Sequence, residues 1–382
     1  MLAIVNAHVL PVSAPPISGG TVLISEGRIV DVGKQVSVPA SAQLIDAGGR
    51  TLTPGLIDAH SHVGLTEIGV GWEGADAHES GAPVSATNRV LDGINPRDNG
   101  FSDLVKGGVT CANVLPGSAS VLCGVGAAVK CTGSVADEML LLEPTCVKAA
   151  LGEVPKARFG AKGRPPMTRM GIAAVLRDAL YRAKEYAEKN EAKRRYDRDT
   201  SVLALVIRKQ IPLAVHAHRA DDIATAIRLA RQFDIRLTIE HATEADLVLD
   251  MLKCCGASVA FTPVARQLMA PEAQRRGFEA PVRCAEHGIP FCLATDHPQS
   301  NGKYLSVLAA LAVGWGMQYE QAIRAITLGA AEHVGISDWV GSIERGKHAD
   351  LVLWSGDPLE FSTFADYTII DGRVAYAREV CE

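Results

Sequence analysis

Short apolar runs alternate with amphipathic stretches through the middle of the chain. In Met170–Lys189 the apolar side chains recur three and four residues apart, which predicts a helix with one buried face. Ile223–Gln232 and Glu244–Cys254 are predicted helices as well. Continuous apolar strands that alternate with helices are typical of a parallel sheet covered on its outside, and eight of them predict an α/β protein with a TIM-type (β/α)8 barrel. The eight apolar runs, most of which end in polar residues or histidine, are Gly55–His62, Val109–Pro116, Ala127–Cys131, Val147–Gly152, Pro212–His218, Leu237–His241, Ser258–Pro263 and Pro290–Asp296.

The two ends of the chain have a different pattern, rich in Val and Ile and interrupted by turns. Leu2–Leu10 and Thr21–Val32 are predicted strands. Near the other end, Ile369–Val374 repeats the pattern of Ile24–Ile29, in which an apolar strand, an acidic residue and Gly are followed by a second strand that begins with Arg. Strand-like segments at both ends, around a different middle, predict one small sheet domain built from both termini.

The length of the chain agrees with this division. A barrel of this type takes about 250 residues, which leaves about 130 of the 382 for other parts. We expect residues 1–51 and 340–382 to form one discontinuous domain, and residues 52–339 to form the barrel.

Two long connections interrupt the barrel pattern, Val63–Asn99 after the first strand and Val264–Val282 after the seventh. Connections longer than about 15 residues are usually functional or disordered. We therefore expect substrate specificity to lie on these loops, where polar side chains such as those of His78, Arg266 and Gln267 face either the pocket or solvent.

Composition excludes several classes of protein. With 47% hydrophobic and 21% charged residues, the chain is globular rather than disordered. A net charge of −5 offers no basic surface for a nucleic acid, and no apolar run is long enough to span a bilayer. The N-terminus lacks the basic start of a signal peptide, and nine cysteines without paired spacing indicate reduced thiols. We expect a cytoplasmic protein that binds a small-molecule substrate but neither nucleic acid nor membrane, and homo-oligomerisation stays open.

Histidines and an aspartate stand at the ends of several predicted strands. His60 and His62 close the first strand, and residues two apart in a strand point the same way, so both imidazoles can reach one metal ion. Five of the 11 histidines lie at strand ends, and functional groups of such barrels collect at the carboxyl ends of the strands. This pattern predicts a metal site. The residues at the other strand ends are His216, His218, His241 and Asp296.

Two segments resemble the amidohydrolase superfamily. Pro54–His62 matches its strand-one motif, and Gly341–Trp354 matches the segment that returns to the small sheet domain. Within the superfamily the chain is most similar to the imidazolonepropionase-related branch of metal-dependent hydrolases. The resemblance implies a distorted (β/α)8 barrel, a small β-sandwich formed by both termini, and one or two divalent metal ions, usually Zn²⁺.

The resemblance also implies roles for the strand-end residues. His60 and His62 would bind the more buried metal, and His216 and His241 would bind the second. Asp296 would contact the buried metal and act as a proton shuttle. In such a site the metal activates water as hydroxide for attack on a carbonyl carbon, and the aspartate passes the proton to the leaving nitrogen.

A site with two metals needs a bridging anion, for which relatives use a carboxylated lysine or a glutamate. Lys148, in the fourth predicted strand, is the first candidate, and Glu153 is the alternative. Lys130, in the third strand, is a weaker third option. If none of them bridges, the site holds one metal.

The residues after His216 bear on the type of reaction. Deaminase-type relatives place a glutamate just beyond the fifth-strand histidine, but here Ala217, His218 and Arg219 follow. His218 and Arg219 are therefore candidates to orient a substrate carboxylate or carbonyl group, since arginine binds carboxylates with two parallel hydrogen bonds. An ion pair between Arg219 and Asp221 or Asp222 is the alternative.

The sequence predicts a metal-dependent hydrolase of carbon–nitrogen bonds in small molecules. Cyclic amides, N-acyl amino acids and dipeptides are the expected substrates. A metal-dependent deaminase is the first alternative, and a barrel without catalytic activity that serves as a scaffold is the second.

Overall fold

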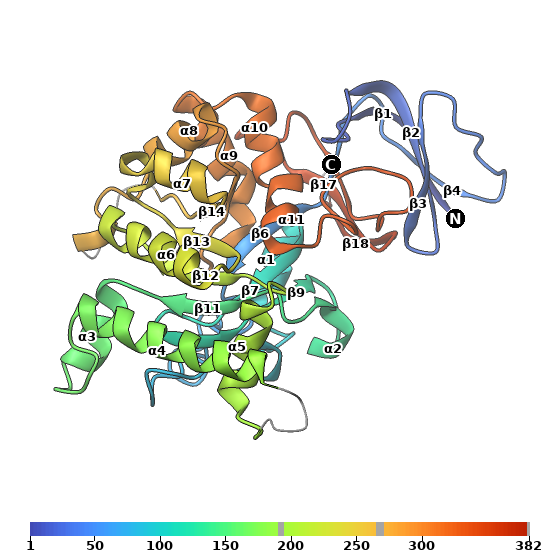
Figure 1. Ribbon diagram of the computed structural model, residues 1–382. Helices are drawn as coiled ribbons and strands as arrows, with labels where there is room; N and C mark the ends of the chain where they lie inside the picture. The colour runs from blue at the N-terminus through green and yellow to red at the C-terminus, as the bar shows by residue number, and fades with distance from the viewer. Residues whose placement is uncertain (190–194, 265–270, 380–382) are drawn as a thin grey trace.

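Both ends of the chain contribute strands to one eight-stranded sheet. The computed structural model describes residues 1–189, 195–264 and 271–379. In Figure 1 the first strands (blue) and the last strands (red) lie side by side at one end of the molecule. The order is β18-β17-β16-β5-β1-β2-β3, and β4 also pairs with β1. The strands are β1 (Leu2–Val9), β2 (Ile17–Ser25), β3 (Arg28–Gly33), β4 (Gln43–Asp46), β5 (Thr51–Pro54), β16 (Leu351–Trp354), β17 (Ala365–Ile370) and β18 (Arg373–Ala377).

The repeated pattern of the two ends forms two similar hairpins in this sheet. β2 pairs with β3 and β17 pairs with β18, both antiparallel. The turn residues Glu26, Gly27, Asp371 and Gly372 all have positive φ, as a two-residue turn of type I′ requires. A Cβ on Gly27 would lie 3.1 Å from the carbonyl oxygen of Asp371, so the two turns pack against each other. The strands form one connected sheet, and its division into the two layers of a sandwich stays a prediction.

Each of the eight predicted runs in the middle of the chain contains a strand. The strands fall into two further sheets, β10-β9-β7-β6, in which β10 is Leu140–Leu142, and β15-β14-β13-β12-β11-β8. Most of their residues are buried, and their side chains are mainly Ala, Val, Leu and Ile. The predicted strand positions are therefore confirmed. The eight are β6 (Leu56–Ser61), β7 (Val109–Val114), β9 (Ala127–Lys130), β11 (Val147–Ala150), β12 (Leu213–Ala217), β13 (Leu237–His241), β14 (Ser258–Phe261) and β15 (Phe291–Leu293).

The third predicted strand has the opposite direction to that expected. β8 (Leu122–Val125) and β9 follow each other with only Gly126 between them. β9 pairs antiparallel with β7, and β8 pairs antiparallel with β11. The segment between β7 and β8 holds no helix, and a parallel connection needs a crossover of a dozen or more residues that is usually helical. The expectation of eight parallel strands is therefore wrong at this position.

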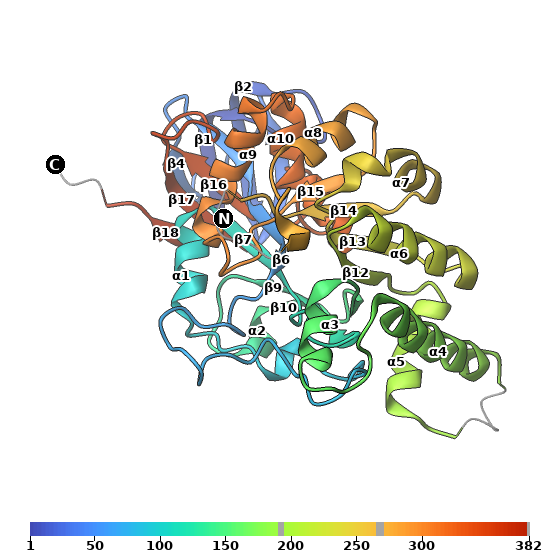
Figure 2. The same ribbon diagram turned by 90° about the vertical axis from the view of Figure 1, so that its left-hand side faces the viewer.

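The predicted helices form with small changes at their ends. Met170–Lys189 is α4 (Arg169–Glu188), and Ile223–Gln232 lies within α6 (Ala220–Phe233). Glu244–Cys254 is divided into the 3-10 helix η3 (Ala245–Leu247) and α7 (Leu249–Cys255). Figure 2 shows α4, α6 and α7 in succession along one side of the molecule. The other helices are η1 (Val90–Asp92), α1 (Asn99–Lys106), α2 (Ala136–Met139), α3 (Glu153–Gly160), α5 (Arg198–Ile207), η4 (Pro271–Ala273), α8 (Glu279–Glu286), η5 (Gly302–Tyr304), α9 (Leu305–Gly314), α10 (Tyr319–Ala325) and α11 (Leu328–Val334).

Backbone hydrogen bonds join the two middle sheets where the histidine motif stands. The N–H of Asp296 donates to the carbonyl of His60 (3.0 Å), and the N–H of His62 donates to the carbonyl of His297 (2.9 Å). The end of β6 is thus held beside the segment that follows β15. This places the first and the last predicted strand ends next to each other.

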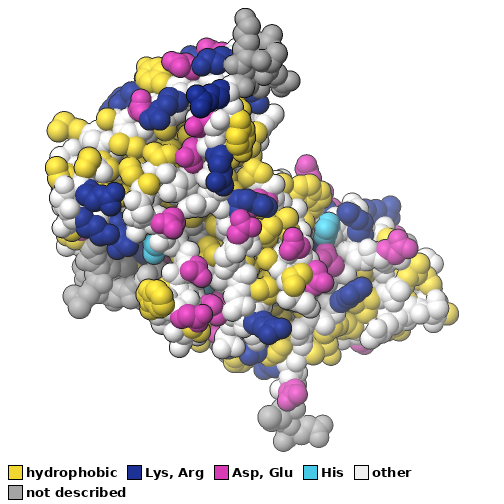
Figure 3. Space-filling view, turned by 90° about the horizontal axis from the view of Figure 1, so that it is seen from below, with side chains coloured by type: hydrophobic (Ala, Val, Ile, Leu, Met, Phe, Trp, Pro, Cys, Tyr) yellow, Lys and Arg dark blue, Asp and Glu magenta, His cyan; other side chains and the backbone are white. Residues whose placement is uncertain are grey.

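The surface mixes charges of both signs. On the face in Figure 3, acidic and basic side chains are interspersed with apolar ones. Across the described residues, a search for helices with the length and apolar character of a membrane span finds none.

Candidate metal centre

Six side chains of the metal-ligand types gather in two groups at the strand ends. In each group the ligand atoms lie within 4.8 Å of one another. The rings of His60 and His241 are 4.6 Å apart between centroids, so the two groups are neighbours. The groups are His60, His62 and Asp296, and His216, His218 and His241.

Hydrogen bonds at Nδ1 fix the two histidines of β6. His60 Nδ1 lies 2.6 Å from Glu240 Oε2, and His62 Nδ1 lies 2.7 Å from the carbonyl oxygen of Leu115. Because a carbonyl oxygen can only accept and Glu240 is ionised in this environment, Nδ1 carries the proton in both rings. The lone pair of each neutral ring is therefore on Nε2, where a metal can bind it.

Hydroxyl groups hold the other three imidazoles in the same way. Nδ1 of His216, His218 and His241 lies 2.9, 2.7 and 2.7 Å from a hydroxyl oxygen in each case. Among the described residues, Nε2 of His60 and of His216 is buried without a hydrogen-bond partner. Buried polar atoms without a partner are rare, so these atoms fit a bound metal ion. The hydroxyl groups belong to Ser118, Thr243 and Thr262.

The backbone is strained where the ligands stand. His241, Ala242 and Asp296 have φ of 72°, 41° and 57°, in the left-handed region that residues other than glycine rarely adopt. Such strain is common at functional sites, because the surrounding structure holds the side chains in one direction.

Burial keeps four of the five strand-end histidines in the neutral form that binds metals. It lowers the pKa of His60 to about 4, assisted by the charge of Lys148. It also lowers the pKa of His218 to about 3, assisted by the charge of Arg276. The pKa values of His216 and His241 lie well below the usual value, for which burial is the largest cause.

Asp296 is held in its ionised form. Burial alone would raise the pKa of this carboxyl, but the interaction with His62 and the positive charge of Arg276 outweigh burial and hold the pKa well below its usual range. Arg276 Nη2 donates to Asp296 Oδ2 at 2.8 Å. The other carboxylate oxygen, Oδ1, lies 3.7 Å from His60 Nε2 and 3.5 Å from His62 Nε2.

The three candidates for a bridging group have different surroundings. Lys148, on β11, is fully buried, and among the described side chains its Nζ has no partner. β11 pairs with β12, the strand that carries His216, and the positive charge of Lys148 is among the causes that lower the pKa of His60 and of His216. Glu153 begins α3, is half-buried and belongs to neither group. Lys130 is 2.5 Å from Asp350 in an ion pair with the terminal sheet, so the weaker third option is wrong.

His218 and Arg219 separate in the structure. His218 belongs to the second group of ligand atoms rather than standing apart as a substrate contact. The side chain of Arg219 is 45% exposed and donates to Asp221 through Nε and Nη2, both at 2.9 Å. The expected substrate contact of Arg219 is therefore replaced by the ion pair with Asp221.

A cavity of about 440 Å³ opens onto both groups. Among the described residues of its lining is the cation Arg276, which no sequence pattern marks. Its loop has no periodic pattern that would have marked it, and residues 265–270 of that loop, Arg266 and Gln267 among them, lie outside the described residues. The lining also includes His78, Ser118 and Gln299.

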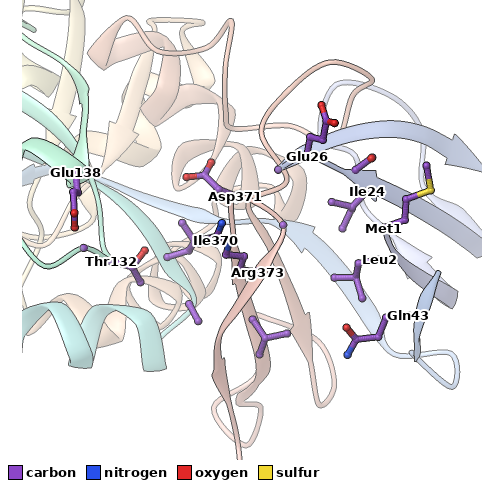
Figure 4. A pocket seen from close by; sticks show the side chains of 16 residues that line it. Met1, Leu2, Ile24, Glu26, Gln43, Thr132, Glu138, Ile370, Asp371 and Arg373 are labelled. Carbon is purple, nitrogen blue, oxygen red and sulfur yellow. The ribbon is translucent and has the colours of Figure 1, made fainter. Parts of the chain in front are cut away.

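A larger cavity, of about 1030 Å³, lies between the terminal sheet and the segment around α2. Its labelled side chains include Glu26, Glu138, Asp371 and Arg373 (Figure 4). None of the six ligand-type residues lines it. The size of a cavity therefore does not identify the functional site. The smaller cavity is the candidate because metal-ligand side chains line it.

His78 is held against Gly117 at the edge of the smaller cavity. A Cβ on Gly117 would lie 2.1 Å from the His78 ring, so Gly117→Ala should expel this ring and destabilise the protein by about 1–3 kcal/mol. Adding His78→Ala should remove most of that cost, because the clash is then gone. Urea denaturation of the two single variants and the double variant measures this coupling, and additive effects would show that the ring does not pack there.

A mixed α/β fold with histidines and an aspartate gathered at its strand ends is the architecture of metal-dependent hydrolases. The chain belongs to the amidohydrolase family, whose family model matches residues 51–375. It is therefore an amidohydrolase, an enzyme that acts on carbon–nitrogen bonds.

Individual relatives agree with this membership. The crystal structure of an amidohydrolase from Thermotoga maritima MSB8 is 36% identical, covers 99% of this chain and 100% of that chain, and has a TM-score of 0.95. An imidazolonepropionase from Sphingopyxis alaskensis is 26% identical over 90% of this chain and 88% of its own length. Amidohydrolase tasK from Hapsidospora irregularis is 26% identical over 94% of this chain, which spans only 40% of that relative. The predicted family and its imidazolonepropionase-related branch are confirmed.

Proposed function

We propose that this enzyme hydrolyses amide or cyclic amide bonds of small molecules with Zn²⁺ at the two histidine groups. The observation that carries the proposal is the meeting of two groups of ligand-type side chains, five of whose six members line one cavity, with the buried Nε2 atoms of His60 and His216 unpartnered among the described residues. N-acyl amino acids, dipeptides and cyclic amides are the proposed substrates. A cavity of about 440 Å³ has the size of a small-molecule site.

Each group would hold one ion. His60, His62 and Asp296 are the proposed ligands of the first, and His216 and His241, joined by His218, are those of the second. Carboxylated Lys148 is the proposed bridge, with Glu153 as the less favoured alternative. When bound, the ions would supply a Lewis acid and a water of lowered pKa.

The chain's own residues would move the proton. Asp296 accepts it on a carboxylate that is already ionised at neutral pH, and passes it to the leaving nitrogen. Arg276 holds Asp296 Oδ2 at 2.8 Å and so keeps the carboxylate directed toward the cavity.

We also propose the finer architecture. The hydrogen bonds from Asp296 to His60 and from His62 to His297 support a closed, distorted barrel formed by residues 52–339. The pairing of β1–β5 with β16–β18 supports a separate terminal domain of residues 1–51 and 340–382. β5 crosses the proposed boundary at residue 51 and pairs with the terminal strands.

The test of the function is a substrate panel. Zinc-loaded and chelator-treated protein are compared on N-acyl amino acids, dipeptides, cyclic amides and amino-substituted heterocycles. Zinc-dependent cleavage of an amide is the expected result. Zinc-dependent release of ammonia from the heterocycles alone would favour the deaminase alternative, and no turnover of any compound at full zinc loading would contradict the proposal.

Zinc is expected to stabilise the folded protein. Binding to the folded state alone adds about 2.7 kcal/mol to the free energy of unfolding when free zinc is 100 times its dissociation constant. Urea denaturation with and without zinc measures the difference. Mg²⁺ is the control, because sites rich in imidazole bind it weakly. Equal stability in both conditions would contradict a zinc site.

A further inference from the structure

Glu272 brings a further carboxylate close to the histidine groups. It lies on η4, in the connection after β14, and its side chain is 2% exposed. Its Oε2 accepts hydrogen bonds from the backbone N–H of Glu153 (2.7 Å) and from Arg169 Nη2 (3.2 Å). These two contacts fix the carboxylate and leave Oε1 directed elsewhere.

The other oxygen faces His216. Glu272 Oε1 lies 4.0 Å from His216 Nε2, which is too far for a hydrogen bond. Within the described part of the chain, both atoms are buried and neither has a hydrogen-bond partner. A buried polar atom without a partner costs about 1–3 kcal/mol, so two such atoms that face each other indicate a shared partner.

The distance between the two atoms suits a metal ion as that partner. Bonds from zinc to imidazole nitrogen and carboxylate oxygen are about 2.0–2.2 Å long and their arrangement is tetrahedral, so two ligand atoms of one ion lie about 3.3–3.6 Å apart. Glu272 Oε1 and His216 Nε2 are 4.0 Å apart, so a bound ion would draw the two atoms together by about 0.5 Å.

The charges around the second histidine group also favour a carboxylate ligand there. The group of His216, His218 and His241 consists of imidazoles alone, whereas the first group contains Asp296. A carboxylate beside His216 would supply this group with the negative charge that its three imidazoles lack.

The neighbouring backbone leaves room for the carboxylate. Gly152 has a φ of 86°, and a Cβ at this position would lie 2.7 Å from Glu272 Oε2. A glycine here permits both the left-handed conformation and the close approach of Glu272.

We propose that Glu272 is a carboxylate ligand of the second metal site, bound alongside His216. The inference rests on the proposed function for the presence of the metal, and it adds a ligand from the connection after the seventh predicted strand. It assigns no proton transfer to Glu272.

The test measures zinc binding rather than turnover. Full-length metal-free protein is titrated with zinc against a competing chromophoric chelator, and bound metal is counted by elemental analysis. In Glu272→Gln we expect the second equivalent of zinc to bind at least about 100-fold more weakly, which exceeds the roughly 10–100-fold expected for a residue that only supports a ligand. The first equivalent should bind as in the wild type.

Asp222→Asn is the matched control. Asp222 is also buried and accepts from Arg169 (3.0 Å), but, unlike Glu272, which lies 4.0 Å from His216, it has no histidine within ion-pair distance among the described residues. Its substitution removes one negative charge from the same neighbourhood, and we expect less than about a 10-fold change in zinc affinity. An equal effect of the two substitutions would overturn the proposal, because the loss would then come from charge at a distance.

The remaining outcomes separate this inference from the proposed function. A second zinc bound by Glu272→Gln with wild-type affinity overturns the inference and leaves the hydrolase intact. If the wild type binds only one zinc ion and hydrolyses amides, the inference is likewise overturned and the proposed hydrolase function stands. A wild type that binds no zinc overturns both. If circular dichroism shows that Glu272→Gln does not fold, Glu272→Asp is measured instead, since it moves the carboxylate back by one methylene group. Wild-type affinity of Glu272→Asp for the second zinc ion would overturn the inference.

Discussion

Replacing Asp296 with Asn is expected to lower kcat by about 10²–10⁴-fold on any amide that the enzyme hydrolyses, the range typical of general acid–base groups. Asn has the same size, so the buried side chain should keep its place beside His60 and His62. The amide, however, cannot accept a proton from water or return it to the leaving nitrogen. Steady-state kinetics at saturating zinc measure the effect, with the bound metal determined on the same samples.

The metal measurement decides what a loss of activity means. Asp296 is also a proposed ligand, so only a zinc-loaded variant with low kcat assigns the proton transfer to this residue. Asp76→Asn is the matched control, because Asp76 is an exposed carboxylate on the connection after β6 and is not one of the six ligand-type residues. A zinc-loaded Asp296→Asn variant with full hydrolysis would remove the proposed role.

Replacing Lys148 with Met is expected to change activity and stability in opposite directions. The Nζ of Lys148 is buried, with no partner among the described residues, so in metal-free protein its charge is uncompensated. Met fills similar space without a charge, and we expect the metal-free protein to gain about 1–4 kcal/mol of stability. Activity should fall at least about 10²-fold, since the proposed bridge between the two metals is lost. Urea denaturation in metal-free buffer depleted of carbon dioxide measures the first effect, and kinetics at saturating zinc measure the second.

Lys130 provides the control for this substitution. It is buried like Lys148, but it pairs with Asp350 at 2.5 Å and with Asp371 at 3.1 Å. Lys130→Met leaves Asp350 buried without its partner, so stability should fall by about 3–5 kcal/mol. If both substitutions destabilise the protein to the same extent, Lys148 has a structural partner and is not a free group awaiting carboxylation.

The sequence was sufficient for the positions of the strands but not for all their directions. Apolar runs mark buried strands whichever way the chain passes through the sheet. The third run, Ala127–Lys130, is as apolar as its neighbours, and its direction follows from the segment before it. That segment turns back without a helix, which makes β9 antiparallel to β7. Local composition does not contain this information.

For the candidate site too, the sequence was sufficient for some residues and not for others. Side chains that alternate along a strand and stand at its end were found, because strand geometry alone brings His60 and His62 to one face. Arg276 and Glu272 were missed, since they lie on a long connection whose course depends on tertiary contacts. Arg219 was proposed for its closeness in sequence to His218, but the backbone turns its side chain toward Asp221. Once a strand has ended, a residue that follows a ligand in the sequence need not share the surroundings of that ligand.

The terminal sheet also bears on how the protein is made. β5 pairs with β1 on one side and with β16 on the other, and Pro54 lies opposite Leu351. During synthesis β5 leaves the ribosome before the metal-binding residues, while its second partner follows after them. One edge of this strand therefore stays unpaired while the whole metal-binding part of the chain is translated, and the sheet is completed only when β16, β17 and β18 have followed.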